Sequence, residues 1–351
     1  MTSKERVRVA MSGGKPDQVP AAFEAVGSVW TKLMKHYGFS NRDQLFEKFR
    51  IDIYPTDARY IGPALESYVD SEGNKVNVSY WGHHTTVHTT DVGSYNVTVK
   101  HPLDGMTTIE EIKIGYTFPK VEWFDFSNIT NVCNKYPDKA IIIGHPGPFQ
   151  MVTNLMSMEE FFILMYDDPE VASYILDQMV AFELAYYEEC FKAGNGKIDV
   201  LRPHDDYGTQ ISMLFSTDMW DEYFKENTKK LVDLAHKYGA FYQQHSCGAV
   251  RPIIGRLIEC GVDALEPVQK VCGLEIESLA EEFDGKITFH GGVDTQGLLP
   301  NGTPEEVAAE TRHIIETLGK NGGYILMASQ SFEPDVPIEN IEAVYSVSRI
   351  I

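Results

Sequence analysis

Short apolar runs alternate with longer amphipathic stretches over nearly the whole sequence, and this alternation limits the possible folds more than any other feature. Such a rhythm is typical of repeated strand and helix units with parallel strands. Eight runs qualify as strands, which predicts a (β/α)8 barrel whose active site lies at the carboxyl ends of the strands. The predicted strands are 19–25, 51–55, 140–144, 199–202, 240–244, 264–268, 287–290 and 324–328.

One stretch interrupts the rhythm, at residues 60–116. It has little helical period and instead carries alternating, β-branched segments, which predicts an antiparallel β insertion after the second strand. A chain of 351 residues can form one large barrel with insertions. We therefore predict a single domain over 1–351, with the β-rich insertion at 60–116 inside it.

Helix starts are readable between the strands. Ser157 with Glu160 and Thr303 with Glu306 have the spacing of a capping box, in which each side chain satisfies a backbone N–H of the first turn. Helices are therefore predicted to begin just after Ser157 and Thr303.

Charge and cysteine content exclude several classes of protein. The chain has 30 Lys and Arg against 51 Asp and Glu, a net charge of −21, which argues against a nucleic-acid partner because phosphate affinity requires clustered cations. The five cysteines lack framework spacing and the first 20 residues lack an apolar signal core, so we expect a cytoplasmic protein. The longest uncharged run, 140–158, contains prolines that a lipid-facing helix would not tolerate, so we expect no membrane segment.

Polar side chains follow most of the predicted strands and are candidates for the active-site rim. Any one of them could instead cap a helix or bond loop backbone, so none is decisive alone. They are Tyr54, Asp57, His145, His204, Asp205, Asp206, His245, Cys247, Glu266, Asp294 and Gln330.

The pair His245 and Cys247 is the most informative of these. Residues two apart on an extended segment point the same way, so an imidazole and a thiolate converge, and these are ligands of Zn²⁺. Glu266 should end the neighbouring strand and could complete a three-ligand catalytic zinc site. The alternative for Glu266 is a carboxylate that bonds a helix N-terminus or loop backbone. A rival cluster, His83, His84 and His88, is treated as surface or rim histidines, since His84 and His88 would lie about 13 Å apart along a strand.

His204 and Asp206 end the fourth predicted strand beside the proposed zinc site. The two residues are two positions apart, so on an extended segment their side chains face the same side, toward the pocket. There either could donate a proton or orient the zinc histidine. A structural role in strand-loop bonding is equally open.

Four segments together resemble the uroporphyrinogen decarboxylase superfamily. They are HSCGAVRPII at 245–254, GVDALEPVQ at 261–269, FHGGVDTQGLLPNGTPEEV at 289–307 and FEPDVPIENI at 332–341. The resemblance covers most of the chain from residue 140 onward and implies a (β/α)8 barrel. The His-x-Cys element resembles that of the zinc-dependent methyltransferase branch of the superfamily. Enzymes of this branch move methyl groups between a donor, a corrinoid protein and coenzyme M. True decarboxylases carry arginines near the amino terminus for the substrate's carboxylates, whereas residues 20–28 here contain none, which argues against decarboxylation.

The resemblance implies that His245, Cys247 and Glu266 ligate zinc. Enzymes acting on coenzyme M have a second cysteine near the end of the last strand, and Gln330 stands there in this chain, as a weak fourth ligand or a substrate contact. Fewer thiolates leave the zinc more Lewis-acidic, which favours an oxygen substrate.

We therefore predict a methyltransferase that moves a methyl group from an O-methyl donor, a methoxylated aromatic, to the cob(I)alamin of a separate corrinoid protein. No Asp-x-His-x-x-Gly corrinoid-carrying motif occurs in the chain, so the corrinoid is expected on a partner. His145, Phe149 and Tyr207 are predicted substrate contacts, with His204 and Asp206 as catalytic groups. The alternatives are a methylcorrinoid:thiol methyltransferase, a decarboxylase-like lyase and a non-enzymatic corrinoid- or metal-binding module.

Overall fold

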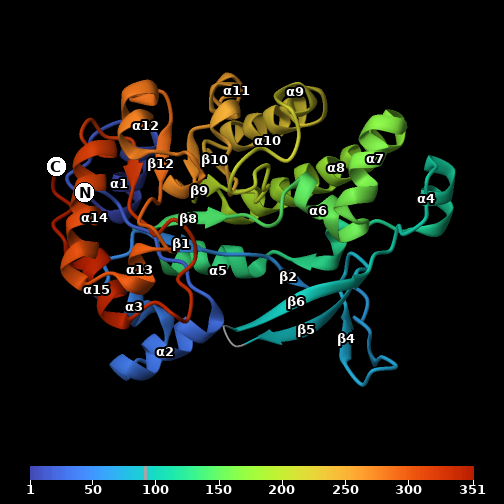
Figure 1. The fold of residues 1–351 in the computed structure, drawn as a ribbon, viewed down its shortest axis with the longest axis horizontal. Coiled ribbons are helices and arrows are strands. Elements are labelled where there is room, and N and C mark those ends of the chain that lie inside the picture. Colours follow the sequence, from blue (N-terminus) through green and yellow to red (C-terminus); the bar gives the residue numbers. More distant parts are fainter. Residues whose placement is uncertain (91–92) are drawn as a thin grey trace. The chain divides into compact units, whose positions relative to one another are not determined.

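The computed structural model describes residues 1–90 and 93–351, and these residues divide into two compact units (Figure 1). Unit 1 comprises Met1–Thr56, Asn131–Gly144 and Gly194–Ile351. Unit 2 comprises Asp57–Thr130 and His145–Ala193.

Within the described residues, unit 1 is built on a parallel seven-stranded sheet in the order β1-β8-β9-β10-β11-β12-β13. The segment that forms β8, Ala140–Ile143, is a continuous apolar run and is buried at every position, as expected for a parallel strand covered on both faces. The strands are β1 (Ile53–Pro55), β8 (Ala140–Ile143), β9 (Ile198–Leu201), β10 (Phe241–His245), β11 (Ala264–Glu266), β12 (Thr288–His290) and β13 (Tyr324–Ile325).

An eighth extended segment joins the two edges of this sheet. Ala21 forms an isolated parallel bridge with Leu326, just after β13, and its carbonyl accepts a hydrogen bond of 2.8 Å from the N–H of Asp52, just before β1. Pro20 has no N–H to donate, so this segment forms isolated bridges rather than a continuous ladder. All eight predicted strands thus contribute to one ring, and the predicted (β/α)8 barrel is confirmed. β9 and β10 have the predicted length, each shifted by one residue, and the other strands are shorter than their apolar runs.

Helix α1 (Ser3–Met11) packs on the amino end of the ring. Its apolar residues Val7, Ala10 and Met11 are spaced three to four apart, so they form one buried stripe. Burying each large apolar side chain contributes about 1.5–3 kcal/mol, which fixes the helix against the strands. The core cluster that contains this stripe also includes Ala22, Ile53, Ala140, Ile142, Val200, Ala264, Ile325 and Met327.

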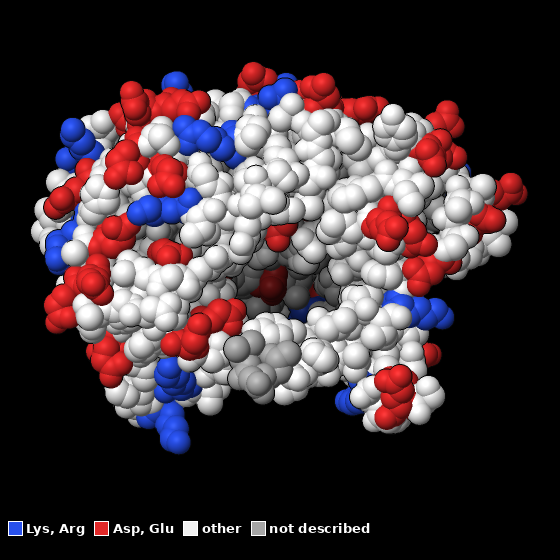
Figure 2. All heavy atoms as spheres, viewed as in Figure 1, with Lys and Arg blue, Asp and Glu red and all other residues white. Residues whose placement is uncertain are grey.

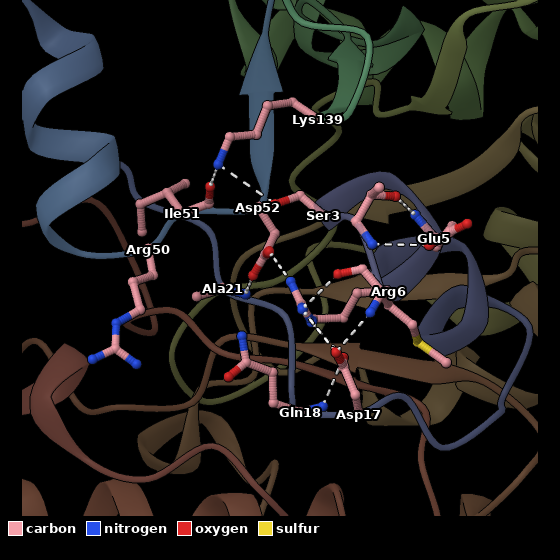
Figure 3. Close-up of polar contacts among 12 residues, drawn as sticks. Ser3, Glu5, Arg6, Asp17, Gln18, Ala21, Arg50, Ile51, Asp52 and Lys139 are labelled. Atoms are coloured by element: carbon pink, nitrogen blue, oxygen red, sulfur yellow. Dashed lines mark hydrogen bonds and ion pairs between the residues drawn. The ribbon is translucent and has the colours of Figure 1, made fainter.

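Charged side chains accompany this helix at the amino end of the barrel. The carboxylate of Asp52 is only 2% exposed and accepts hydrogen bonds from Arg6 Nη1 at 2.6 Å, Arg349 Nη1 at 3.1 Å and the N–H of Ala21 at 2.9 Å. Arg6 also donates to both oxygens of Asp17, at 2.7 and 3.0 Å (Figure 3). We call Arg6, Asp17, Asp52 and Arg349 the amino-end cluster.

The remaining helices of unit 1 lie between successive strands in the chain, except the last helix, which follows β13. The predicted capping box at Thr303 and Glu306 is confirmed, because each side chain bonds the other residue's backbone N–H at the start of α14. The helices are α2 (Gly27–Tyr37), α3 (Arg42–Lys48), α9 (Thr217–Tyr223), α10 (Lys225–Lys237), α11 (Ile254–Glu259), α12 (Ile276–Phe283), α13 (Leu298–Asn301), α14 (Pro304–Leu318) and α15 (Ile338–Ser346), with 3₁₀ turns at Arg251–Ile253 and Lys270–Cys272.

Unit 2 contains an antiparallel sheet of four strands in the order β3-β4-β5-β6. It follows the second strand of the barrel, so the predicted antiparallel insertion is confirmed. The prediction of one domain over 1–351, with the insertion bounded at 60–116, stays a prediction. The strands are β3 (Ser67–Val69), β4 (Lys75–Val78), β5 (His84–Thr90) and β6 (Gly93–Lys100), and β2 (Arg59–Tyr60) pairs antiparallel with β7 (Phe124–Asp125).

The helices of unit 2 include α7, which begins at the predicted capping box of Ser157 and Glu160. Two helices cross between the units in the chain: α5 ends in unit 1, and α8 ends at its first residue there. The bounds are α4 (Ile109–Gly115), α5 (Ser127–Lys135), α6 (Pro148–Leu155), α7 (Met158–Asp167) and α8 (Pro169–Gly194), with a 3₁₀ turn at Val121–Trp123.

Acidic side chains are widely spread over the face shown in Figure 2, in keeping with the net charge of −21. None of the helices in residues 1–90 and 93–351 combines the length and the apolar character that crossing a lipid bilayer requires.

Candidate metal centre at the carboxyl end of the barrel

Three side chains meet at the carboxyl end of β9 and β10. His245 is the last residue of β10, Cys247 follows two positions later, and Asp206 lies five residues beyond the end of β9. One ligand atom from each of the three lies within 4.8 Å of the other two, which is close enough to share one metal ion. We call Asp206, His245 and Cys247 the triad.

The contacts within the triad are short. Nε2 of His245 lies 3.4 Å from Sγ of Cys247 and 3.4 Å from Oδ1 of Asp206. The same Asp206 oxygen accepts the N–H of Cys247 at 2.8 Å, so the loop after β9 is tied to the loop after β10. Gln330 Nε2 lies 2.6 Å from the cysteine sulfur.

Two glycines let these loops approach each other. Gly248 has a φ of +89°, and a Cβ at this position would lie 2.4 Å from the carbonyl carbon of Gly208. A side chain at Gly248 would therefore strain the backbone and separate the two loops. Cys247 lies one residue before Gly248 and Asp206 two residues before Gly208, so the glycine contact positions the cysteine sulfur and the aspartate carboxylate.

Glu266 lies on the other side of the imidazole. Its Oε2 is 2.6 Å from Nδ1 of His245 and 3.4 Å from Nη1 of Arg202, and the side chain is 1% exposed. The predicted ligand set of His245, Cys247 and Glu266 therefore differs from the arrangement in the structure. Glu266 contacts Nδ1 whereas Cys247 and Asp206 face Nε2, so the imidazole ring lies between Glu266 and the other two side chains. Ligation of a metal by Glu266 stays a prediction.

The charges around His245 set the protonation of its neighbours. Burial alone would raise the pKa of Glu266, but the charges of His245 and Arg202 and the hydrogen bond from His245 outweigh it, so the pKa lies well below its usual range. Burial would likewise lower the pKa of His245, yet the facing carboxylates of Glu266 and Asp206 raise it. Burial raises the pKa of the Cys247 thiol, partly opposed by His245, so binding a cation here would release the thiol proton.

Three buried polar atoms near the triad have no hydrogen-bond partner within the described residues. They are Nε2 of His204, Nε2 of His290 and Oε1 of Gln243. His290 Nδ1 contacts Gln243 Nε2 at 2.9 Å, and the ring of His204 lies 4.6 Å from that of His245 between centroids. Burial lowers the pKa of His204 to about 3 and that of His290 to about 4, so both rings are neutral at pH 7.

The structure therefore assembles only part of the predicted site. Asp206, predicted as a catalytic group, joins His245 and Cys247, and Gln330 contacts the sulfur. The ring of His204 lies beside that of His245, tilted by 30°. The sequence did not predict the contact of Arg202 with Glu266. The one sequence signal for Arg202 is a positive charge at the end of an apolar predicted strand.

The predicted aromatic substrate contacts are interior residues. Tyr207 is 2% exposed and its hydroxyl donates to Asp205 at 2.9 Å, so its ring offers almost no surface to a ligand. Phe149, in unit 2, is 1% exposed.

His145 also belongs to unit 2, where its Nδ1 lies 3.7 Å from the buried carboxylate of Glu183. Its role in substrate binding stays a prediction. Among the described residues the triad alone has the spacing of a metal site, so the rival set of His83, His84 and His88 does not form one there.

Comparison with known proteins places the chain in a family. Residues 99–349 match the family described as Uroporphyrinogen decarboxylase (URO-D). Curated relatives include the methylcobamide:CoM methyltransferase MtbA of Methanosarcina acetivorans, 24% identical over 220 residues, which are 62% of this chain and 62% of the relative. A uroporphyrinogen decarboxylase from Magnetococcus marinus is 22% identical over 187 residues, 51% of this chain and 48% of the relative.

The chain thus spans about three-fifths of the length of the first of these relatives. Among solved structures, a methyltransferase from Methanosarcina mazei has the same fold, with a TM-score of 0.68 at 20% identity over 98% of this chain and 97% of that one. The family match covers well over half of the chain, and the barrel and the His-x-Cys segment after its fifth strand lie largely inside it. This protein belongs to the uroporphyrinogen decarboxylase (URO-D) family.

Proposed function

We propose that this protein is a zinc-containing methyltransferase of the corrinoid-dependent type. The observation that carries the proposal is the triad, an imidazole, a thiol and a carboxylate converging at the carboxyl end of the barrel. Active sites of this fold lie at that end. The relatives named methylcobamide:CoM methyltransferases support the class of reaction.

The triad fits zinc by the chemistry of its donors. Nitrogen, sulfur and oxygen ligands are those that Zn²⁺ takes, and three protein ligands are typical of a catalytic rather than a structural site. Glu266 supports this assignment, because a carboxylate on the second nitrogen of a histidine holds the ring and its tautomer for a metal at the first. We therefore propose Asp206, His245 and Cys247 as ligands and Glu266 as the residue that orients His245.

We propose an O-methyl donor, specifically a methoxylated aromatic, with the cob(I)alamin of a separate corrinoid protein as methyl acceptor. When bound, zinc would act as a Lewis acid on the donor oxygen. A thiolate donates more electron density to zinc than a carboxylate does, so zinc held by one thiolate and one carboxylate is more Lewis-acidic than zinc held by two thiolates. The neutral amide of Gln330 brings no negative charge to the metal. His204 is neutral and its ring lies 4.6 Å from that of His245 between centroids, so it adds no positive charge beside the proposed zinc ligands.

The second candidate is methyl transfer from a methylcorrinoid to a thiol, because that is the activity in the names of MtbA and MtaA. In this case the zinc would bind the thiol of the acceptor. The two candidates differ in the chemistry of the small molecule, so they can be separated by one pair of assays.

The zinc assignment is tested by metal content. We expect about one zinc per wild-type chain, and loss of most of it in His245→Ala, Cys247→Ala and Asp206→Ala. Cys260→Ala, a buried cysteine outside the triad, is the matched control and should keep its zinc. Unchanged zinc content in the triad variants would end the metal hypothesis.

The reaction is tested by two assays on the zinc-loaded protein. Methoxybenzenes with chemically reduced cob(I)alamin should yield methylcobalamin and the free phenol, followed by the absorbance of the corrinoid. Methyl transfer only from methylcobalamin to a thiol such as coenzyme M would replace our choice of donor by the second candidate. Inactivity in both assays, with zinc bound, would favour a binding module.

A further inference from the structure

An aromatic cavity of about 340 Å³ lies at the carboxyl end of the barrel in unit 1. Four aromatic side chains form one continuous wall, with ring centroids 4.9 Å apart for Phe23 and Trp30, 5.8 Å for Trp30 and Phe46, and 5.2 Å for Phe46 and Tyr54. Small-molecule sites occupy about 300–1,000 Å³ and are lined mainly by apolar and aromatic groups. The cavity therefore has the size and the lining for a single aromatic ring.

This cavity adjoins the triad through two of its lining residues. Ser331 follows Gln330, whose amide contacts the sulfur of Cys247. Arg202 contacts the same Glu266 oxygen that holds His245. A ligand in the cavity would thus contact Arg202 and Ser331, which are linked to the triad through Glu266 and Gln330.

One cation of the lining has no anionic partner. The guanidinium carbon of Arg42 lies 4.4 Å above the centroid of the Trp30 ring, and within the described residues Arg42 forms no ion pair. The neighbouring carboxylate of Asp43 is instead engaged by the hydroxyls of Tyr54 and Tyr136, at 2.5 and 2.6 Å, and by Lys135.

The other cation of the lining is already engaged. Arg202 is paired with the carboxylates of Glu24 and Glu266. Within the described residues, only Arg42 offers this cavity a positive charge without a carboxylate partner, in a chain whose net charge is −21. A guanidinium stacked on an indole keeps its N–H edge available, and that edge matches a carboxylate through two parallel hydrogen bonds.

We propose that this cavity binds a small aromatic carboxylate, with the ring against Trp30 and Tyr54, the two partly exposed aromatic side chains of the lining, and the carboxylate on Arg42. The proposal rests on the proposed function in one respect, because the bound aromatic acid would be the methyl donor. It narrows the donor from methoxylated aromatics in general to those that carry an anionic group on the ring.

The test compares binding of two probes, para-methoxybenzoate and the neutral para-methoxybenzyl alcohol, by calorimetry on the zinc-loaded protein. In Arg42→Gln we expect the affinity for the benzoate to fall about tenfold or more and the affinity for the alcohol to stay the same. Arg42→Lys should recover part of the loss, since it restores the charge without the planar fork. Arg312→Gln is the matched control, because Arg312 is also an exposed arginine with no ion pair among the described residues and lies on α14, outside the cavity.

Equal losses in Arg42→Gln and Arg312→Gln, or equal losses for the two probes, would overturn the proposal. So would undiminished benzoate binding when Trp30→Leu removes the stacking ring. The test is independent of turnover. If the benzoate binds through Arg42 but its methyl group is not transferred, the proposed function is wrong and the binding site is supported. If methyl transfer is unchanged in Arg42→Gln, the proposed function is supported and this binding site is wrong.

Discussion

At the amino end of the barrel, the buried carboxylate of Asp52 receives hydrogen bonds from two arginines and a backbone N–H. At the carboxyl end, His204, His290 and Gln243 each keep a buried polar atom without a partner in the described residues. Unsatisfied buried polar groups cost stability, so a fold retains them where they serve a site. The difference indicates that the amino end is built for stability and the carboxyl end for chemistry.

The largest effect should come from removing the charge at the centre of the amino-end cluster. Asp52→Ala leaves Arg6 and Arg349 without a buried counter-charge, and breaking a buried pair in this way costs about 3–5 kcal/mol. Urea unfolding followed by circular dichroism measures the loss. A loss below about 1 kcal/mol would show that the amino end is not held together by this carboxylate.

At the carboxyl end, Glu266→Gln should weaken zinc binding rather than unfold the barrel. Substitution of a residue that orients a metal-bound histidine typically lowers metal affinity about 10- to 100-fold. Competition with a chromophoric chelator measures this affinity, with Asp206→Asn as the comparison. We expect Asp206→Asn to lose more affinity than Glu266→Gln, and the reverse order would restore Glu266 as the ligand.

The pair of His290 and Gln243 tests the cost of unsatisfied groups directly. His290→Leu alone leaves the Nε2 of Gln243 without its hydrogen-bond partner, which lowers the free energy of unfolding by about 1–3 kcal/mol. The double variant His290→Leu, Gln243→Leu removes both polar groups and should be closer to wild type than the single variant. Urea unfolding of the three proteins gives the order, and a double variant less stable than the single one would contradict the comparison.

The smallest effect concerns the exposed member of the amino-end cluster. Hydrogen bonds from Arg6 hold the pKa of Asp17 below its usual range. A lowered pKa in the folded state means that the carboxylate stabilises the fold above its unfolded pKa of about 3.9, and that this contribution is lost as the pH falls toward the folded pKa. Since Asp17 is 42% exposed, we expect Asp17→Asn to cost about 0.2–1 kcal/mol at pH 7. The difference from wild type should shrink in unfolding curves measured at decreasing pH below about 4, and a difference that grows in acid would contradict this.

Much of the fold could be predicted because it is encoded locally. The apolar run at 140–143 had to be a buried strand, and Thr303 with Glu306 had to begin a helix, since both patterns express backbone hydrogen bonding within a few residues. The segment at 19–25 was predicted as a strand but pairs only through isolated bridges, because a proline deprives it of one donor.

The candidate site could be predicted only in part. His245 and Cys247 are neighbours in the chain, so their convergence follows from strand geometry alone. Whether Asp206 or Glu266 stands beside them depends on which nitrogen of the imidazole faces the cysteine. That orientation is held by Glu266, the last residue of β11, and by Arg202, which directly follows β9.

The sequence by itself determined the number and order of the strands, the helix starts, the His-x-Cys pair and the excess of negative charge, because each depends on residue type at short separation. Only the tertiary structure decided that Asp206 joins the triad, that Tyr207 is enclosed, and that Arg42 and Trp30 reach one cavity with Phe23. These facts depend on which loops touch and which way each ring turns. The energies that settle them come from contacts between segments far apart in the chain, and no local pattern records those contacts.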